Sequence, residues 1–584
     1  MLWKRISQQK LLRAKPSIGK DRKFTKIMQV SGHPSAWTSQ RKPKRKFLNI
    51  AKHRIRVVKK QKMEGVNGVD ERVDPMDWIS ELPESIIHYI LSFLRCPKDV
   101  ARISVLSKKW RHIWASFLTF NFDQKSFQAQ GAEQNENFKD FIENSLSTRL
   151  EPMFGIQKFR LYMTSFNLKL APHMNRWISA ATAKNVKELE IHVGVKQKRY
   201  YSLPQTVLTA KTITSLKLYG CRLDICSDIK LAHLRELSIK KVCINVHIIQ
   251  SLIGSCPLIE DLRLIHCSGL EYLHVSALLK LNRIEVHECH GLKWVEVVIP
   301  NLQTFWYHGK GSMPCKINLA ACGNLKTLTL KDTDMTDELF QEQIIKFSDL
   351  EDLVLKECNT LQRITILSQK LKRLALLRCE KLEEANIDAP NLLSFEYTGD
   401  KIPFSSMIVS SLHEVKLYFQ STRKNQDIIL FNMLQKFLGK FDQSKVLKLV
   451  LQEDKNVIIY EELKEIQLFP FTELKLDIIK SSRTLKEHVD SLLRMCHPKT
   501  LSIVSSSGSK FLKFLHEEIM DREGTPNCCR YYTRKCWRHY LENVEIEESE
   551  GVENRISSWN PWLNPSPTLQ KSTTFTLNWR SNEQ

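Results

Sequence analysis

The sequence has no long apolar run and few residues that break regular structure. No stretch of about 18 apolar residues occurs, so we expect no membrane-spanning helix. No apolar segment of signal-peptide length follows the first residues, so we do not expect secretion. Only 19 glycines and 20 prolines occur among 584 residues, and hydrophobic residues make up 42%, which excludes a disordered chain. Most of the chain should fold, as several domains or as an elongated repeat structure.

Paired cysteines and the common catalytic motifs are also missing. The 15 cysteines show no paired spacing, which indicates a reduced intracellular protein. Cys528, Cys529, Cys536 and His539 lack the spacing of a structural zinc site. The sequence contains no phosphate-binding loop, no dinucleotide fingerprint and no H-E-x-x-H or G-x-S-x-G signature. We therefore expect no metal, no cofactor and no enzyme; a thioester-forming cysteine is the one catalytic alternative, and no cysteine stands out for it.

Acidic residues are almost missing from the first 62 positions. This segment holds 20 Lys or Arg and the single acid Asp21, so +19 of the net charge of +24 lies here and only +5 remains elsewhere. Residues 1–75 also lack helical or strand periodicity, and we interpret them as a basic, disordered extension. The folded part has too small a positive excess to predict nucleic-acid binding.

A compact basic cluster lies inside this extension: Arg41, Lys42, Lys44, Arg45 and Lys46. Nuclear import receptors and nucleic acid recognise such clusters, so we expect the protein in the nucleus, the cytoplasm or both. Three alternatives stay open. They are a solvated tail without a partner, an organelle transit peptide, and a true start at Met63, where a less basic stretch begins.

A small helical unit follows between positions 77 and 114. Pro83 suits the first turn of a helix, and apolar residues then recur at helical spacing over 84–94. Pro97 ends that helix, because the residue before a proline avoids the α region. A short second helix comes next, and a third begins at Ser107 as its N-cap. So small a unit cannot bury all its apolar side chains, so some should face a partner.

The opening Leu-Pro, the S-F-L that closes the first helix and the S-K-K-W-R of the third resemble the F-box family. In that family the module docks on a Skp-type adaptor, which connects it to a cullin, a RING subunit and a ubiquitin-conjugating enzyme. Carried over position by position, the resemblance implies nine adaptor-binding residues: Leu82, Pro83, Ile86, Ile87, Ile90, Leu91, Leu94, Val105 and Trp110. The alternative is a helical cap packed against the repeats.

Downstream, a hydrophobic triplet of the form L-x-x-L-x-L recurs. Its copies run from Val186/Leu189/Ile191 to Leu412/Val415/Leu417 at steps of 20 to 27 residues. This is the period of leucine-rich repeats, in which every repeat adds one strand to a parallel sheet. Fainter copies extend the array toward residue 505.

A second triplet series lies halfway between some of these copies, as at Leu270/Leu273/Val275 and Leu361/Ile364/Ile366. It predicts strands, in place of helices, on the outer side of those turns. Five cysteines each come three residues after a triplet, where these repeats place Asn or Cys to turn the chain: Cys221, Cys267, Cys289, Cys358 and Cys379. We expect them to be structural.

The whole layout resembles plant F-box proteins with leucine-rich repeats, and residues 536–546 look like the closing strand of an FBD domain. The predicted fold class is α+β: an N-terminal three-helix F-box module followed by a leucine-rich-repeat solenoid with a parallel sheet. The expected parts are the extension (1–75), the F-box module (76–116), the solenoid (117–505) and a C-terminal region (506–584). The last 30 residues, with three Trp among Pro, Ser and Asn, should form a loosely held tail.

The resemblance implies a non-catalytic, substrate-recognition subunit of an SCF-type cullin–RING ubiquitin ligase, whose repeats bind an unidentified target protein. Two alternatives stay open: a nuclear scaffold or nucleic-acid-associated protein that acts through the basic extension, and an F-box scaffold that never joins a ligase. The middle residues of the L-x-L strands share one face and should line the target-binding surface: Lys217, Ser238, Arg263, Glu285, Thr329, Val354 and Ala375. Their mixed charge and size suit a protein better than a phosphate backbone.

Overall fold

The chain divides into two units, Met1–Arg199 and Tyr200–Gln584, and each is considered by itself. The computed structural model describes the following residues: 79, 82–92, 97–127, 131–149, 155–164, 168–195, 200–226, 228–309, 315–399, 402–419, 446–451, 472–478, 493, 497–505, 537–551 and 570–580. Several residues of the sequence predictions lie outside this set. They are the extension with its basic cluster at 41–46, the adaptor candidate Leu94, and Cys528, Cys529 and Cys536.

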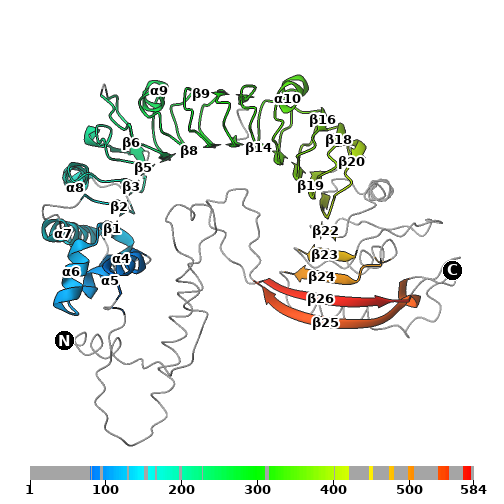
Figure 1. Cartoon of the computed structure of the whole chain (residues 1–584), viewed down its shortest axis with the longest axis horizontal. Helices are drawn as coiled ribbons and strands as arrows, with labels where there is room; N and C mark the ends of the chain where they lie inside the picture. The colour runs from blue at the N-terminus through cyan, green and yellow to red at the C-terminus, as the bar shows by residue number, and fades with distance from the viewer. Residues whose placement is uncertain are drawn as a thin grey trace, which may run out of the picture. The chain divides into compact units, whose positions relative to one another are not determined.

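The first unit begins with the three predicted helices (Figure 1). They are α4 (Glu84–Ser92), α5 (Pro97–Ile103) and α6 (Lys108–Ser116). Proline stands at the first position of α5, where its missing N–H leaves no hydrogen bond unmade. At the start of α6, the Ser107 hydroxyl oxygen accepts a hydrogen bond from the Trp110 N–H. The helical module that the sequence predicts is confirmed.

A short parallel sheet follows the module in the same unit. Its strands pair in the order β1 (Thr119–Asp123), β2 (Lys158–Met163) and β3 (Glu188–Val193). Each strand alternates buried and half-buried residues, so one face of the sheet contributes to the core. The connections between them contain two α-helices and two single 3-10 turns: α7 (Gly131–Arg149), α8 (Ala171–Ala183), η1 (Gln124–Ser126) and η2 (Leu168–Leu170).

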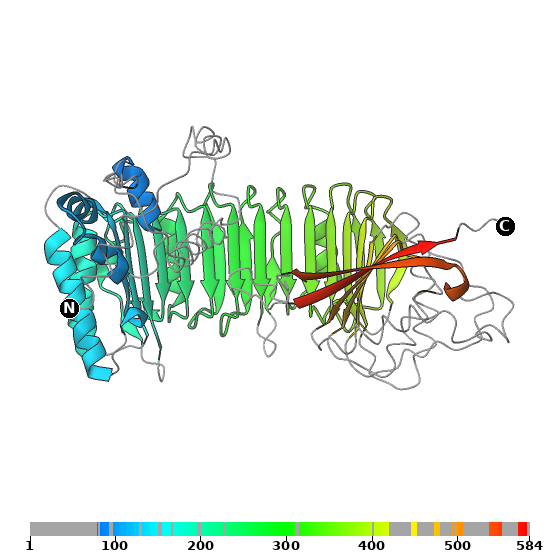
Figure 2. The ribbon, with the colours of Figure 1, turned by 90° about the horizontal axis from the view of Figure 1, so that it is seen from below.

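The second unit is a stack of parallel strands, one from each turn of the chain (Figure 2). In order they are β5 (Ser215–Tyr219), β7 (Glu236–Lys240), β8 (Asp261–Ile265), β10 (Arg283–His287), β12 (Thr304–His308), β14 (Thr327–Lys331), β15 (Asp352–Lys356), β17 (Arg373–Leu377), β19 (Ser394–Gly399), β21 (Glu414–Phe419), β22 (Val446–Leu451), β23 (Glu473–Ile478) and β24 (Thr500–Ser505). Consecutive strands pair in parallel without a register shift. The predicted solenoid with a parallel sheet is confirmed.

The outer side of this unit carries strands in some turns and helices in others. Two three-stranded parallel sheets lie there: β9 (Tyr272–Ser276) with β11 (Trp294–Val298) and β13 (Lys316–Asn318), and β16 (Arg363–Leu367) with β18 (Glu384–Asp388) and β20 (Phe404–Ile408). The helices α9 (Val246–Ser255) and α10 (Asp337–Ile344) occupy this side in two other turns (Figure 1). The first turns add three short elements: β4 (Tyr201–Ser202), η3 (Gln205–Val207) and β6 (Cys221–Arg222). The second triplet series therefore predicted four of these outer strands, β9, β11, β16 and β18, and missed β13 and β20.

A residue in the left-handed backbone conformation directly follows several strands of the inner sheet. The backbone angle φ is +51° at His266, +44° at Glu288 and +53° at Glu357, each directly after its strand. This conformation turns the chain away from the sheet. Gly309 stands at the equivalent position after β12, where a Cβ atom would collide with the carbonyl oxygen of Asp332. Glycine is therefore required at position 309 because of this close approach of the neighbouring backbone.

Cysteines fill the position that follows these left-handed residues. In each case the thiol donates a hydrogen bond to a backbone carbonyl: Cys221, Cys267, Cys289, Cys358 and Cys379. The Cys267 sulfur, for example, lies 3.4 Å from the Ile239 carbonyl oxygen of the preceding strand. Burial raises the pKa of the Cys221 thiol to about 12, so this thiol stays protonated. The predicted structural role of the five cysteines is confirmed.

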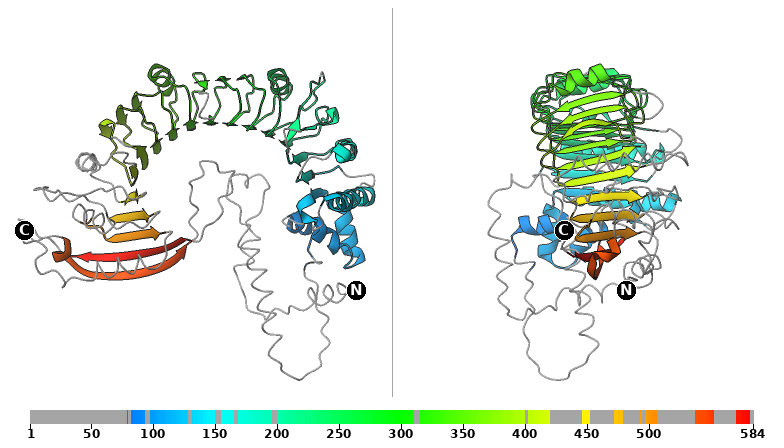
Figure 3. Two further views of the ribbon diagram at one scale, coloured as in Figure 1. Left: turned by 180° about the vertical axis from the view of Figure 1, so that it is seen from behind. Right: turned by 90° about the vertical axis from the view of Figure 1, so that its right-hand side faces the viewer.

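The end of the chain is more ordered than the sequence predicts. The strand β26 (Gln570–Trp579) runs antiparallel between β24 and β25 (Leu541–Gly551), and η4 (Trp537–His539) precedes β25 (Figure 3). Phe575 and Leu577 of β26 are buried. The prediction of a loosely held tail over the last 30 residues is therefore wrong for β26. Apolar and polar residues alternate along this strand, which is a strand pattern that the proline-rich sequence before it obscured.

Candidate interaction surfaces

All three helices of the N-terminal module contribute to its interior. The buried residues are Ile87, Leu91, Val100, Trp110, Ile113 and Phe117. Ile87 and Leu91 are four residues apart and therefore share one side of α4. The adjacent His88 ties α4 to α6, because its Nε2 atom lies 3.0 Å from the Ile113 carbonyl oxygen. Three predicted adaptor-binding residues thus need correction, because a partner cannot reach them in this conformation: Ile87, Leu91 and Trp110.

A second side of α4 is apolar and exposed. Ile86, Tyr89 and Ile90 share this side by their spacing, and Ile86 is 37% and Ile90 43% exposed. Val105, between α5 and α6, is 70% exposed, whereas Leu82 is partly buried against the core. Of the predicted docking residues, the structure leaves four exposed: Pro83, Ile86, Ile90 and Val105. Tyr89 was missed because it lies outside the motif positions, although its spacing from Ile86 on a helix would have revealed it.

The strand register places the predicted target-binding residues in one row across the second unit. Lys217 pairs with Ser238, and the row then passes through Arg263, Glu285, Trp306, Thr329, Val354 and Ala375. The structure therefore confirms that these residues share one face of the sheet. Target binding on this face stays a prediction. Trp306 was missed, although it is the middle residue of its own triplet.

Four residues of this row are less accessible than predicted. Glu285 is only 1% exposed, and Arg263, Val354 and Ala375 are also buried. Adjacent strands lie about 4.8 Å apart, so longer neighbours cover a short side chain such as Ala375. Arg263 and Glu285 are instead buried in contact with each other. Three predicted residues stay half-buried and accessible from outside: Lys217, Ser238 and Thr329.

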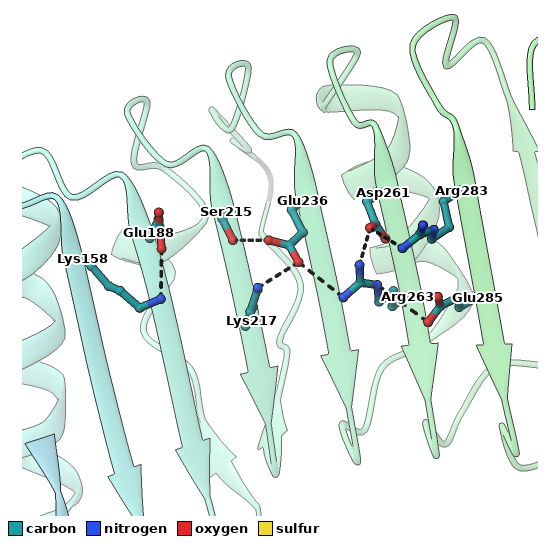
Figure 4. A network of polar contacts seen from close by, with 9 residues as sticks. All are labelled: Lys158, Glu188, Ser215, Lys217, Glu236, Asp261, Arg263, Arg283 and Glu285. Atoms are coloured by element: carbon teal, nitrogen blue, oxygen red, sulfur yellow. Dashed lines mark hydrogen bonds and ion pairs between the residues drawn. The ribbon is translucent and has the colours of Figure 1, made fainter. Parts of the chain in front are cut away.

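Arg263 is the centre of an ion-pair network on this face (Figure 4). Its guanidinium lies 3.4 Å from Glu236 and 3.7 Å from Glu285, and it also pairs with Asp261. Burial alone would raise the pKa of Glu236, but the hydrogen bond and charge of Lys217, 2.8 Å away, hold that pKa below its ordinary value. Three cations face three carboxylates, so the network carries no net charge: Lys217, Arg263 and Arg283 with Glu236, Asp261 and Glu285.

Two histidines end the strands β10 and β12 on the same face. His287 is 5% exposed, and neither of its ring nitrogens has a hydrogen-bond partner. Its ring centroid lies 5.9 Å from that of His308, whose Nε2 atom is 2.6 Å from Lys331 Nζ. Burial lowers the pKa of both histidines to about 4, and the charge of Lys331 adds to this effect at His308. Both imidazoles are therefore neutral near pH 7.

Acidification from pH 6.5 to about pH 4 should destabilise the fold through these histidines. In this window the unfolded chain binds a proton at His287 that the folded chain excludes, so stability falls by about 1.4 kcal/mol for each pH unit and each histidine. Urea unfolding of the His287→Gln chain should therefore show a shallower pH dependence than the native chain. The exposed His233, changed to Gln, is the control. Equal slopes in all three chains would contradict a neutral, buried His287.

Metal sites and membrane-spanning helices are the other features to consider for the described residues. Within these ranges, no group of three or more His, Cys, Asp or Glu side chains could hold a metal ion. No helix in the same part of the chain is long and apolar enough to cross a membrane. The side chains that stand out are thus those of two surfaces, the exposed side of α4 and the strand face of the second unit.

Known protein families match both of these regions. A family model described as F-box-like matches residues 79–119, which contain α4, α5 and α6. The model of the leucine-rich-repeat domain of At1g61320/AtMIF1 matches residues 151–317 and 311–438. The chain belongs to the plant F-box/leucine-rich-repeat family.

Several relatives of this F-box/leucine-rich-repeat protein occur in Arabidopsis thaliana. F-box/FBD/LRR-repeat protein At1g13570 is 32% identical over 204 residues, which are 34% of this chain and 47% of the relative. F-box/FBD/LRR-repeat protein At1g78750 is 29% identical over 210 residues, with shares of 35% and 45%. F-box/LRR-repeat protein 25 is 28% identical over 210 residues, with shares of 36% and 76%. The chain spans less than half the length of the first two, and an FBD-like role for residues 536–546 stays a prediction.

Proposed function

We propose that this chain is the substrate-recognition subunit of an SCF-type cullin–RING ubiquitin ligase. The observation that supports the proposal best is the exposed apolar side of α4, formed by Ile86, Tyr89 and Ile90 together with Val105. The module has its own closed core, so these side chains are not needed for its folding. Apolar side chains held on a rigid helix mark a protein-binding surface. In an F-box/leucine-rich-repeat protein, the matching partner is a Skp-type adaptor.

The strand face of the second unit is the proposed receptor for the target protein. It presents charged, polar and aromatic residues in one continuous row, and its ion pairs are mutually neutralised around Arg263. Such a face suits a protein better than a uniformly charged phosphate backbone. Binding here would raise the local concentration of target lysines near a ubiquitin-conjugating enzyme held elsewhere in the complex. Catalysis then belongs to the partners, and this chain supplies no catalytic residue.

The basic extension has a separate proposed role in nuclear import. The cluster at 41–46 carries five cations in six positions, and residues 1–62 hold +19 of the net charge. Short basic clusters of this kind are recognised as linear segments, so this role would not need the folded units. The second candidate function, a nuclear scaffold or nucleic-acid-associated protein, is favoured by this charge only.

Purification of two chains from plant cells tests these proposals together. The full chain and a variant lacking residues 1–62 should both co-purify with a Skp-type adaptor and a cullin, because the module at 79–119 is retained in both. The shorter chain should shift from the nucleus to the cytoplasm, because it has lost +19 of charge. Mass spectrometry of the purified complexes and fluorescence imaging of both chains give the two readouts.

Three outcomes would count against the proposals. Absence of adaptor and cullin from both purifications would overturn the ligase role. Loss of adaptor only in the shorter chain would show that the extension, and not the module, makes the contact. Nucleic acid that co-purifies with the full chain alone, without adaptor, would favour the second candidate function.

A further inference from the structure

The last residues of neighbouring strands in the second unit form a row without acidic side chains. The register aligns Lys240, Ile265, His287, His308, Lys331 and Lys356, from β7 to β15. We name these six residues the basic row. They lie two positions after the middle residues of the same strands and therefore on the same face of the sheet. The basic row thus borders the proposed receptor face.

Burial and neighbouring cations oppose the charged form of two lysines in the basic row, Lys240 and Lys356. Burial lowers the pKa of Lys240, and the neighbouring Lys241 lowers it further. Burial also lowers the pKa of Lys356, whereas Lys331 Nζ donates a hydrogen bond to the neutral His308 ring, with 2.6 Å between Nζ and Nε2. Cationic side chains that are partly desolvated and close to one another gain free energy when an anion approaches. An anionic group from a bound partner would therefore stabilise these lysines, because the strands of the row carry no acidic side chain at these positions.

The carboxylates next to the row neutralise it only in part. Glu357, which follows β15, lies 3.2 Å from Lys331 and 4.0 Å from Lys356, and Glu288 lies 3.6 Å from His308. Asp332, which follows β14, is a third carboxylate beside the row; burial raises its pKa, and the charge of Lys331 lowers it. Among the described residues, no carboxylate pairs with Lys240, which faces the Tyr219 ring at 6.0 Å. The uncompensated charge is thus greatest toward β7.

The centre of the row contains a polar side chain with no partner. Both ring nitrogens of His287 are buried and make no hydrogen bond. A buried polar group without a partner is unfavourable, and native proteins usually satisfy such groups. Trp306, on the next strand, also has a buried ring N–H with no partner. Because His287 and His308 are neutral near pH 7, the positive charge of the row comes from its three lysines.

The length of the row limits what it can hold. Six strands at a spacing of about 4.8 Å cover about 24 Å, which roughly seven residues of extended chain would span. Beyond Lys356 the row continues into Leu377, which belongs to an apolar cluster with Val354 and Ala375. The positive charge therefore ends there. On the side of the middle row it meets the neutral network around Arg263.

We propose that the basic row binds a short acidic segment of the target protein, in extended form across β7 to β15. Carboxylates of the segment would contact Lys240, Lys331 and Lys356, the three cations of the row. This assignment deepens the proposed receptor function and rests on it. It names acidic, extended segments as the class of target sequence that this chain selects.

Two matched double variants of the full chain test the proposal. Lys240→Gln with Lys331→Gln removes two cations of the row, whereas Lys293→Gln with Lys316→Gln removes two exposed lysines near the outer strands. The probe is a short glutamate-rich peptide with a fluorescent label and a photo-crosslinking group at its centre. Because the control variant has the same net charge, any general attraction to the basic extension is equal in both. Binding should be roughly tenfold weaker for the row variant than for the control.

The expected result includes crosslinks to β10, β12 or β14 and a difference between the variants that shrinks at high ionic strength. Equal affinities of the two variants, or crosslinks only within residues 1–62, would overturn the proposal. Full competition by inorganic phosphate would also overturn it, in favour of a small-anion site, and preferential binding of a single-stranded oligonucleotide would favour nucleic acid. A pull-down of the Skp-type adaptor with both variants reports on the proposed ligase role separately, since neither variant changes the module.

Discussion

Replacing Ile86 and Ile90 together by alanine should weaken adaptor binding by about 2–4 kcal/mol, which is roughly a 30-fold to 1000-fold loss of affinity. Both side chains lie on the exposed side of α4 and make no contribution to the buried core of the module. Their apolar surface would leave water only when a partner covers it. Titration of a Skp-type adaptor against the purified chain measures the loss directly.

The control for this prediction is Leu168→Ala, which shortens an apolar side chain in η2, outside the module, that is 66% exposed and so even more accessible than Ile86 and Ile90. Its adaptor affinity should equal that of the native chain, and circular dichroism should show that all variants are folded. A change of Leu82 and Pro83 to Ala should also weaken binding, although part of that effect would come from the contact of Leu82 with the core. Unchanged affinity of the Ile86/Ile90 variant would remove α4 from the docking surface.

The division of the module into core and surface shows where the sequence was insufficient. The helices, the break at Pro97 and the N-cap at Ser107 follow from local rules, and all three are confirmed. The family resemblance, however, identified the motif positions but not whether each side chain points into the core or toward solvent. Ile86 and Ile87 are adjacent and chemically identical, yet the first is 37% and the second 1% exposed. Only the packing of α4 on α6 distinguishes them.

The repeats show the same limit on a larger scale. The triplet spacing predicted every strand of the inner sheet from β5 to β21, because each repeat must place its apolar residues in a common core. Which middle residues remain accessible depends on neighbours one strand away, and these are separated by 20 or more residues in sequence. Ala375 is covered because Val354 and Glu396 stand beside it in the register. The partners of Arg263 were equally invisible before the register was known.

Replacing Phe575 by alanine should destabilise the C-terminal end of the second unit by about 3–5 kcal/mol, as expected for a fully buried aromatic side chain. Phe575 aligns with Leu501 of β24 on one side and with Ile546 of β25 on the other. At the end of the same strand, the Trp579 ring stacks on His497 with centroids 4.3 Å apart. The strand β26 is therefore part of the sheet, and its removal should destabilise the neighbouring strand β24.

The loss should be local, because each turn of a repeat protein contacts only its neighbours. Hydrogen exchange of the Phe575→Ala chain should accelerate in β24 and β23 while β14 keeps its protection. The control is Thr576→Ala, the next residue along, whose side chain is exposed on the other face of β26 and should change little.

Uniform destabilisation of the whole second unit, or none at β24, would contradict a capping role for β26. That role has a physical reason, because β26 covers the edge of β24, and β25 then ends the sheet with exposed acidic residues such as Glu542, Glu545 and Glu547. Charged edge strands resist pairing with another chain. A chain truncated before residue 570 would leave the β24 edge bare, so it should aggregate at concentrations where the full chain stays in solution, which light scattering would detect.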